Sequence, residues 1–184
     1  GFLSDALREN IRTAIAKRGG IAELRSRDSS GPIEFIIKFR NTETGSEKQP
    51  LVTHELSIDV KPGTTIPIVK KEILKYRRGQ TGKPFNFLDF KEGEGTAITN
   101  EEKFETDKQN FVDERENQKL DSPDILAIKG LGQFQRFKAI NSFRRLLENW
   151  YVSNFQIQAA QVVSDTGISE HLSTTGNNLA QYTK

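Results

Sequence analysis

The sequence predicts an α+β fold in which an antiparallel β-meander packs with amphipathic helices. Between residues 33 and 90, four runs show the two-residue alternation of half-buried strands. Loops rich in Gly, Thr, Lys and Pro separate the runs, and they are too short for the crossovers that parallel strands require. Helical periodicity appears on both sides of the runs, so we expect helices to pack with the sheet.

The predicted strands are the following: Ile33–Arg40, Leu51–Val60, Ile66–Tyr76 and Pro84–Phe90. A turn at 91–95 leads to residues 96–99, which could add a short edge strand. The side chains predicted to form the core are Leu7, Ile11, Ile15, Phe35, Ile37, Phe39, Leu56, Ile58, Phe137, Ile140, Phe143 and Leu147.

Residues 1–20 form the first predicted helix. Ser4 or Asp5 can cap it, apolar residues recur at helical spacing, and Gly19-Gly20 ends it. Residues 21–24 are either one more helical turn or a bend. The loop that follows ends at a Gly-Pro break before the first strand.

The part of the chain after the sheet, which spans residues 33–99, divides in two. Residues 100–121 are so polar that we expect a mobile loop or a solvent-facing helix. Residues 122–184 are predicted to be helical, with a start at Asp121-Ser122-Pro123 and an amphipathic helix over 134–149. We expect all of these parts to form a single domain over residues 1–184.

The composition limits the possible functions. The 184 residues carry a net charge of only +2, which is too small to indicate a nucleic-acid-binding protein by itself. The absence of cysteine excludes thiolate catalysis and Cys-based metal sites, and no apolar run could span a membrane. Because the chain begins at Gly1 and contains no Met, we interpret it as an excised or processed piece of a longer protein. We expect that protein to be cytoplasmic, because a chain without cysteine is compatible with a reducing compartment.

Catalytic and metal-binding patterns are not found. His54 and His171 occur in unlike contexts and are predicted to be structural or surface residues. The acidic pairs Glu101-Glu102 and Asp113-Glu114 are interpreted as solvated charges. We therefore predict no catalytic residue and no metal ligand in this chain.

Two segments superficially resemble phosphate-binding motifs. Residues 79–84 have the wrong spacing for a P-loop, and Pro84 removes a backbone donor, so a hairpin loop is expected. The segment Leu172-Ser173-Thr174-Thr175-Gly176 resembles the Leu-Ser-Gly-Gly segment of ABC-class ATPases, but a turn explains it as well. Neither segment supports a nucleotide site within this chain.

Basic residues gather at two places, on the third strand with its turn and on the second amphipathic helix. Such stripes can neutralise backbone phosphates, although protection of a strand edge and an ordinary polar helix face explain them equally well. The candidate nucleic-acid-binding residues are Lys70, Lys75, Arg77, Arg78, Arg144 and Arg145.

Three segments carry a resemblance to a known family. Residues 1–10 with residues 18–27, which include Arg18-Gly19-Gly20-Ile21, residues 136–155, and Gly176-Asn177-Asn178-Leu179-Ala180 resemble stand-alone predicted ATPases related to the RecF, SMC and OLD proteins. These belong to the ABC-class P-loop NTPases. The resemblance implies that the phosphate loop precedes Gly1 and that the serine segment and acidic pair follow Lys184.

The resemblance also implies a function and its partners. The chain would be a non-catalytic internal portion of an ATP-binding and ATP-hydrolysing head, which binds ATP and Mg²⁺ only as part of the parent protein. Its partners would be the remainder of the head, with a second copy and DNA as further candidates, and no membrane. The alternative is a non-enzymatic module that binds nucleic acid or protein.

Overall fold

The computed structural model of the chain describes residues 1–26, 29–40, 51–76, 85–101 and 112–149. Contacts along the chain divide it into two units, one of Phe2–Glu148 and the other of Gly1 with Asn149–Lys184. The first unit contains the described helices and strands. It is α+β, with an antiparallel sheet and a few helices, as predicted.

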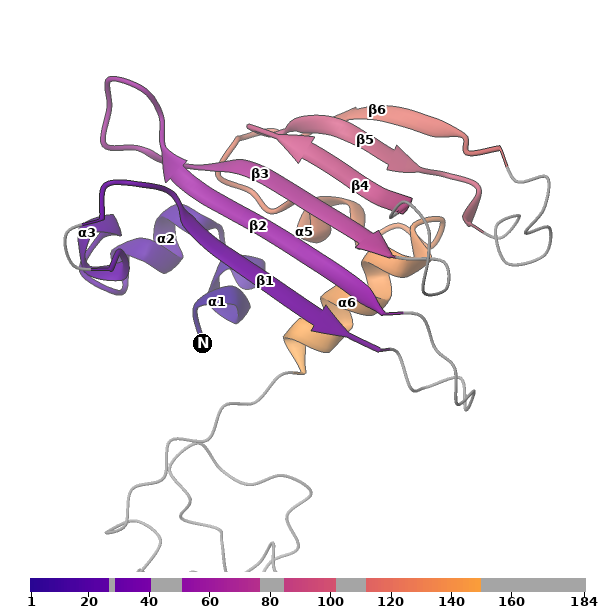
Figure 1. The fold of residues 1–184 in the computed structure, drawn as a ribbon, viewed down its shortest axis with the longest axis horizontal. Coiled ribbons are helices and arrows are strands. Elements are labelled where there is room, and N and C mark those ends of the chain that lie inside the picture. Colours follow the sequence, from indigo (N-terminus) through magenta and orange to yellow (C-terminus); the bar gives the residue numbers. More distant parts are fainter. Residues whose placement is uncertain (27–28, 41–50, 77–84, 102–111, 150–184) are drawn as a thin grey trace, which may run out of the picture. The chain divides into compact units, whose positions relative to one another are not determined.

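Within the described residues, the sheet has six antiparallel strands in the order β1-β2-β3-β4-β5-β6, so each strand pairs with its neighbours in sequence (Figure 1). This is the meander that the short connections predict. The strands are β1 Ile33–Phe39, β2 Val52–Val60, β3 Pro67–Tyr76, β4 Phe85–Lys91, β5 Glu94–Ile98 and β6 Arg115–Lys119.

Helices lie against one face of this sheet, and no helix in the described ranges covers the other face (Figure 1). They are α1 Phe2–Arg8, α2 Ile11–Ala16, α3 Ile21–Leu24, α5 Ala127–Leu131 and α6 Lys138–Glu148. Alternation along the strands produces this arrangement, because every second side chain points toward the helices. In β2, for example, His54, Leu56 and Ile58 are buried while the residues between them are partly exposed.

The amino-terminal helix predicted over residues 1–20 is two helices, and that part of the prediction is wrong. Asn10 has extended backbone angles and its side-chain oxygen accepts a hydrogen bond from Thr13 N at 2.8 Å. Asparagine is among the strongest N-capping residues, and here its cap ends α1 and begins α2. The apolar spacing continues across the break because both helices bury residues against the same core.

The predicted edge strand at 96–99 is an interior strand, because β6 pairs with β5 along its whole length. β6 lies inside the stretch 100–121 that we expected to be mobile or helical, so that expectation is wrong for residues 115–119. The sequence of β6 is entirely polar, and it becomes a strand because β5 offers it a row of unpaired backbone groups. Residues 102–111 lie outside the described residues.

The helical part after the sheet is shorter than predicted within the described residues. α5 begins at Ala127 and not at Ser122, because residues 122–125 form a turn closed by the bond from Ile125 N to Ser122 O. α5 ends at Leu131, with Gly132 as its C-cap, so the helix stops within the run Gly130-Leu131-Gly132. α6 confirms the helix predicted over 134–149 for its central part, and residues 150–184 are outside the described residues.

Most of the predicted core is confirmed. Nine of the twelve side chains are fully buried, from α1, α2, β2 and α6 and from Phe137, just before α6. The three exceptions, Phe35, Ile37 and Phe39, point toward the core but remain partly exposed because β1 is an edge strand with a neighbour on one side only. Phe39 still stacks on Phe143 of α6, with ring centroids 4.8 Å apart.

Candidate functional site

A buried histidine–glutamate pair lies within the sheet, beneath the helices. Nε2 of His54 on β2 is 3.1 Å from Oε1 of Glu72 on β3, and both side chains are completely buried. Inward alternation places both residues on the helix-covered face. Since a buried charge is costly unless it is paired and hydrogen-bonded, the remaining contacts of this pair decide its role.

Glu72 caps helix α5 from a distant part of the sequence. Its Oε2 accepts a hydrogen bond from Ala127 N at 2.5 Å, and Oε1 accepts one from Ile128 N at 3.3 Å. The N-cap residue Leu126 has no side-chain acceptor of its own. A carboxylate at a helix amino end satisfies free N–H groups and interacts favourably with the helix dipole. Glu72 therefore holds α5 on the sheet.

The imidazole of His54 also lies against α6. The rings of His54 and Phe143 are 4.6 Å apart, and Nδ1 of His54 is buried with no hydrogen-bond partner in the described part of the chain. An imidazole so enclosed between strands and a helix cannot reach a substrate. The structural role predicted for His54 is therefore the one its contacts support, and His171 lies outside the described residues.

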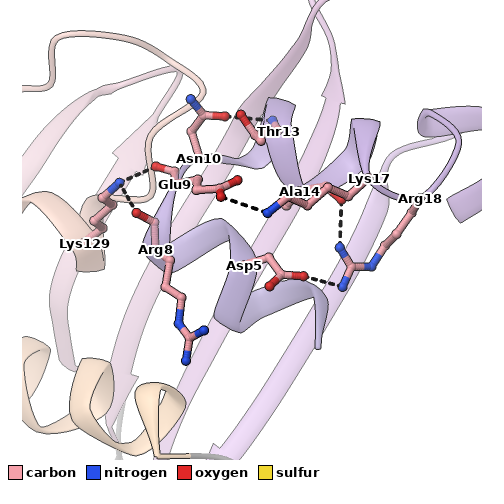
Figure 2. Close-up of polar contacts among 9 residues, drawn as sticks. All are labelled: Asp5, Arg8, Glu9, Asn10, Thr13, Ala14, Lys17, Arg18 and Lys129. Carbon is pink, nitrogen blue, oxygen red and sulfur yellow. Dashed lines mark hydrogen bonds and ion pairs between the residues drawn. The ribbon is translucent and has the colours of Figure 1, made fainter.

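A second polar cluster joins the two amino-terminal segments that carry the family resemblance. The guanidinium of Arg18 donates to the Asp5 carboxylate at 2.6 Å and to the carbonyl oxygen of Ala14 at 2.8 Å (Figure 2). This hydrogen bond is the largest cause of the lowered pKa of Asp5. Gly19 and Gly20 follow with φ values of +84° and +104°, in the region that favours glycine.

A separate contact joins Lys129 of α5 to the end of α1. Its Nζ donates to the carbonyl oxygens of Arg8, at 3.2 Å, and of Glu9, at the carboxyl end of α1 (Figure 2). The last carbonyl groups of a helix have no partner within the helix, so a lysine from elsewhere both satisfies them and complements the helix dipole. The guanidinium of Arg8 points away from these contacts (Figure 2).

The predicted nucleic-acid-binding lysines lie on the uncovered face of the sheet and have acidic partners. Lys70 Nζ is 3.1 Å from Asp59, and Lys75 Nζ is 2.5 Å from Glu55. The pKa of Asp59 is lowered, first by the backbone N–H of Val60 and then by Lys70. These partners reduce the positive potential that the sequence alone suggests.

The predicted arginines lie elsewhere. Arg144 and Arg145 line a hollow of about 450 Å³ beside α6, on the helix-covered side, and Arg144 is paired with Glu148 at 2.8 Å. The two basic groups thus lie on opposite sides of the sheet and do not form one continuous surface. Arg77 and Arg78 are outside the described residues.

The acidic pairs differ in their surroundings. Glu101, which we predicted to be a solvated charge, is buried, and its carboxylate accepts a hydrogen bond from Ala139 N at 2.8 Å in the first turn of α6. That prediction is therefore wrong for Glu101. Asp113 and Glu114 are exposed as expected. Among the described residues, no group of three or more His, Asp or Glu side chains is placed to hold a metal ion.

Sequence reasoning missed the structural importance of Glu72, although a signal was present. Glu72 stands at a position of β3 that shares a face with Leu74 and Tyr76, and an acid at an inward position indicates a buried partner. The carboxylate's contacts with Ala127 and Ile128, however, bridge more than fifty residues and have no local signature.

Comparisons with known proteins complete the description of these sites. No family model, curated protein or solved structure matches this chain. None of the described helices is both long and apolar enough to cross a membrane.

Proposed function

We propose that this chain is a non-catalytic internal portion of an ABC-class ATPase head of the RecF/SMC/OLD type. The remainder of the head would bind ATP and Mg²⁺, and DNA is the candidate substrate of the whole protein. The chain would contribute an antiparallel sheet and its covering helices, and it would bind no nucleotide alone.

The bond between Asp5 and Arg18 carries this proposal. Residues 1–10 and the Arg-Gly-Gly-Ile segment are the best-matched parts of the resemblance, and the arginine of the second segment bonds the aspartate of the first. Both glycines have positive φ, which explains why this sequence appears at a helix end. The two parts of the amino-terminal match thus contact each other, which supports the proposal that this match reflects a shared architecture.

The order of elements gives further support. In the group that the sequence resembles, an Arg-Gly-Gly-Ile segment leads to an antiparallel sheet, and a helix with an aromatic stretch follows the sheet. Here α1, α2 and α3 precede the sheet, and α5 and α6 follow it.

Calorimetric titration with ATP and Mg²⁺ tests the proposal directly. Residues 1–184 should release no binding heat, whereas the longer polypeptide encoded by the same reading frame should bind ATP. In that longer protein, Arg18→Gln should weaken ATP binding because the corner beside the proposed phosphate loop loses its bond to Asp5.

The matched control for this titration is Lys119→Gln, which removes an exposed ion pair with Glu94 at the opposite edge of the sheet. It should leave ATP affinity unchanged. Micromolar ATP binding by residues 1–184 alone would contradict the proposal, as would a reading frame without a phosphate loop upstream of Gly1.

The alternative, a non-enzymatic module for nucleic acid or protein, is favoured by one observation. Arg145 is exposed beside the hollow at α6 and has no ion pair among the described contacts. Gel shifts with duplex DNA at graded salt test this alternative. Loss of retention on replacing Arg144 and Arg145, but not Lys119, would support it, with a salt slope reduced by about one per lost phosphate contact.

A further inference from the structure

A short segment bonds both the sheet and the amino-terminal helices. We define the linking segment as residues 121–131, which comprise the turn after β6 and helix α5. Its bonds to the sheet come from two places on β3. Val69 N donates to the carbonyl oxygen of Pro123 at 2.8 Å, and the carboxylate of Glu72 accepts from Ala127 N and Ile128 N.

The same segment also holds the junction between α1 and α2. Ile11 N donates to the carbonyl oxygen of Asp124 at 3.0 Å, and Nε of Arg12 is 3.4 Å from the Asp124 carboxylate. Lys129 Nζ binds the carbonyl oxygens of Arg8 and Glu9. The junction thus has four contacts with the linking segment, two through Asp124 and two through Lys129.

These contacts supply partners that the two short helices lack. The last carbonyls of α1 and the first N–H groups of α2 have no intrahelical partners, and a buried backbone group without a partner is costly. The junction can therefore move apart from the linking segment only by breaking these bonds. The linking segment in turn is attached to β3 through Glu72.

We propose that the linking segment couples the α1–α2 junction to the centre of the sheet, with Glu72 as the positioning residue at the sheet end. A displacement of the junction would be passed to β3 through α5, and the reverse would hold equally because coupling is reciprocal. The nature of the signal rests on the proposed function. In an ATPase head, α1 would follow the phosphate loop, so the signal would be nucleotide occupancy.

Native-state amide hydrogen exchange on residues 1–184 tests the coupling without any nucleotide. In Glu72→Gln the side chain keeps its shape, but its amide group cannot accept both helix N–H bonds. Exchange at Ile11 N, which Glu72 does not touch, should become about tenfold faster relative to amides in the β2–β3 pair. These strand amides report global unfolding and provide the internal reference.

Ile98→Val is the matched control. Ile98 is fully buried on β5 and makes none of the bonds of the linking segment, so its truncation should accelerate exchange of the strand and junction amides together. Two results for Glu72→Gln would overturn the proposed coupling. One is that exchange at Ile11 N accelerates only as much as exchange of the strand amides, and the other is that only α5 loses protection.

Lys129→Met provides a second test at a side chain that is not buried, where loss of folding is not a concern. It removes the ammonium group but keeps the aliphatic stem, and it should accelerate exchange at the junction while α5 stays protected. In the double variant with Glu72→Gln the two effects should be less than additive, because α5 is already displaced. Additive effects would overturn the proposal.

The result is independent of ATP. If the longer protein failed to bind nucleotide but the coupling was observed, the ATPase assignment would fail and the proposed coupling would stand. If ATP binding was found but the Ile11 amide did not respond to Glu72→Gln, only the coupling would fail.

Discussion

Glu72 and Glu55 lie on adjacent strands and point to opposite faces of the same sheet. Glu72 is fully buried beneath the helices, where it contacts His54 and two N–H groups of α5. Glu55 is on the uncovered face, 32% exposed, and pairs with Lys75. A glutamate side chain is therefore part of the buried core on one face of the sheet, and part of an ordinary surface ion pair on the other face.

The difference follows from solvation. On the uncovered face, water solvates each charge almost as well as the partner does, so exposed pairs contribute between zero and about 1 kcal/mol. Under the helices no water replaces a lost partner, and a single truncation leaves polar groups unsatisfied. The face of the sheet, and not the type of residue, should determine the effect of a substitution.

The largest expected effect is that of Glu72→Ala. This change leaves two N–H groups of α5 and the imidazole of His54 without their acceptor, and we expect a loss of about 3–5 kcal/mol in the free energy of unfolding. Urea denaturation followed by circular dichroism measures it. A loss below about 1 kcal/mol would mean that water replaces the carboxylate.

Arg18→Gln should have an intermediate effect. Arg18 and Asp5 are each a little over one quarter exposed, and the guanidinium also holds the Ala14 carbonyl. We expect a loss of about 1 kcal/mol in unfolding free energy, since partial exposure lets water replace part of the interaction. In urea denaturation, the loss in unfolding free energy of this variant should lie between that of Glu72→Ala and that of Lys75→Gln. Any other ranking would contradict the idea that burial determines the effect of a substitution.

The acidic side chains with shifted pKa values predict a pH dependence. The pKa of Asp59 lies below its ordinary value of 3.8, because the N–H of Val60, then Lys70 and Arg25, favour the carboxylate. A lowered folded pKa contributes stability that is complete above the unfolded value and is lost as pH falls through the folded one. In Asp59→Asn, the decline in stability between about pH 5 and pH 2 should therefore be shallower.

Thermal unfolding across this pH range checks the prediction for Asp59. Asp5, whose pKa is also lowered, should behave in the same direction through its bond to Arg18. A variant whose acid unfolding matched that of the unmodified chain would show that Asp59 keeps no preference for its charged form in the folded state.

The smallest expected effect is that of Lys75→Gln. Its partner Glu55 faces solvent, so the loss should be at most about 0.5 kcal/mol and should vanish at high salt. Urea denaturation at low and high salt measures both quantities. A loss as large as that of Glu72→Ala would show that the uncovered face is buried against something in solution.

The fold was predictable where the pattern was local. Alternation in residues 33–90 predicted β1 to β4 with small errors at their ends, and helical spacing predicted the buried face of α6. β6 was not predictable, because its polar residues have no strand preference and its pairing with β5 is what makes it a strand. The break at Asn10 was available from capping preference but was hidden by the continuous apolar spacing.

The candidate sites were less predictable. Lys70 and Lys75 were identifiable as basic, but their acidic partners come from β2, which the sequence alone does not align with them. Arg144 and Arg145 were predicted together with these lysines, and only the fold reveals that α6 lies on the other side of the sheet.

The sequence by itself determined strands β1 to β4, helix α6 and the side of each that is apolar, because periodicity acts over a few neighbouring residues. Only the tertiary structure decided that Glu72 holds α5, that Lys129 holds the end of α1, and that Arg18 bonds Asp5. These bonds depend on strand register and helix placement, which are set by the burial of the whole core and not by any local pattern.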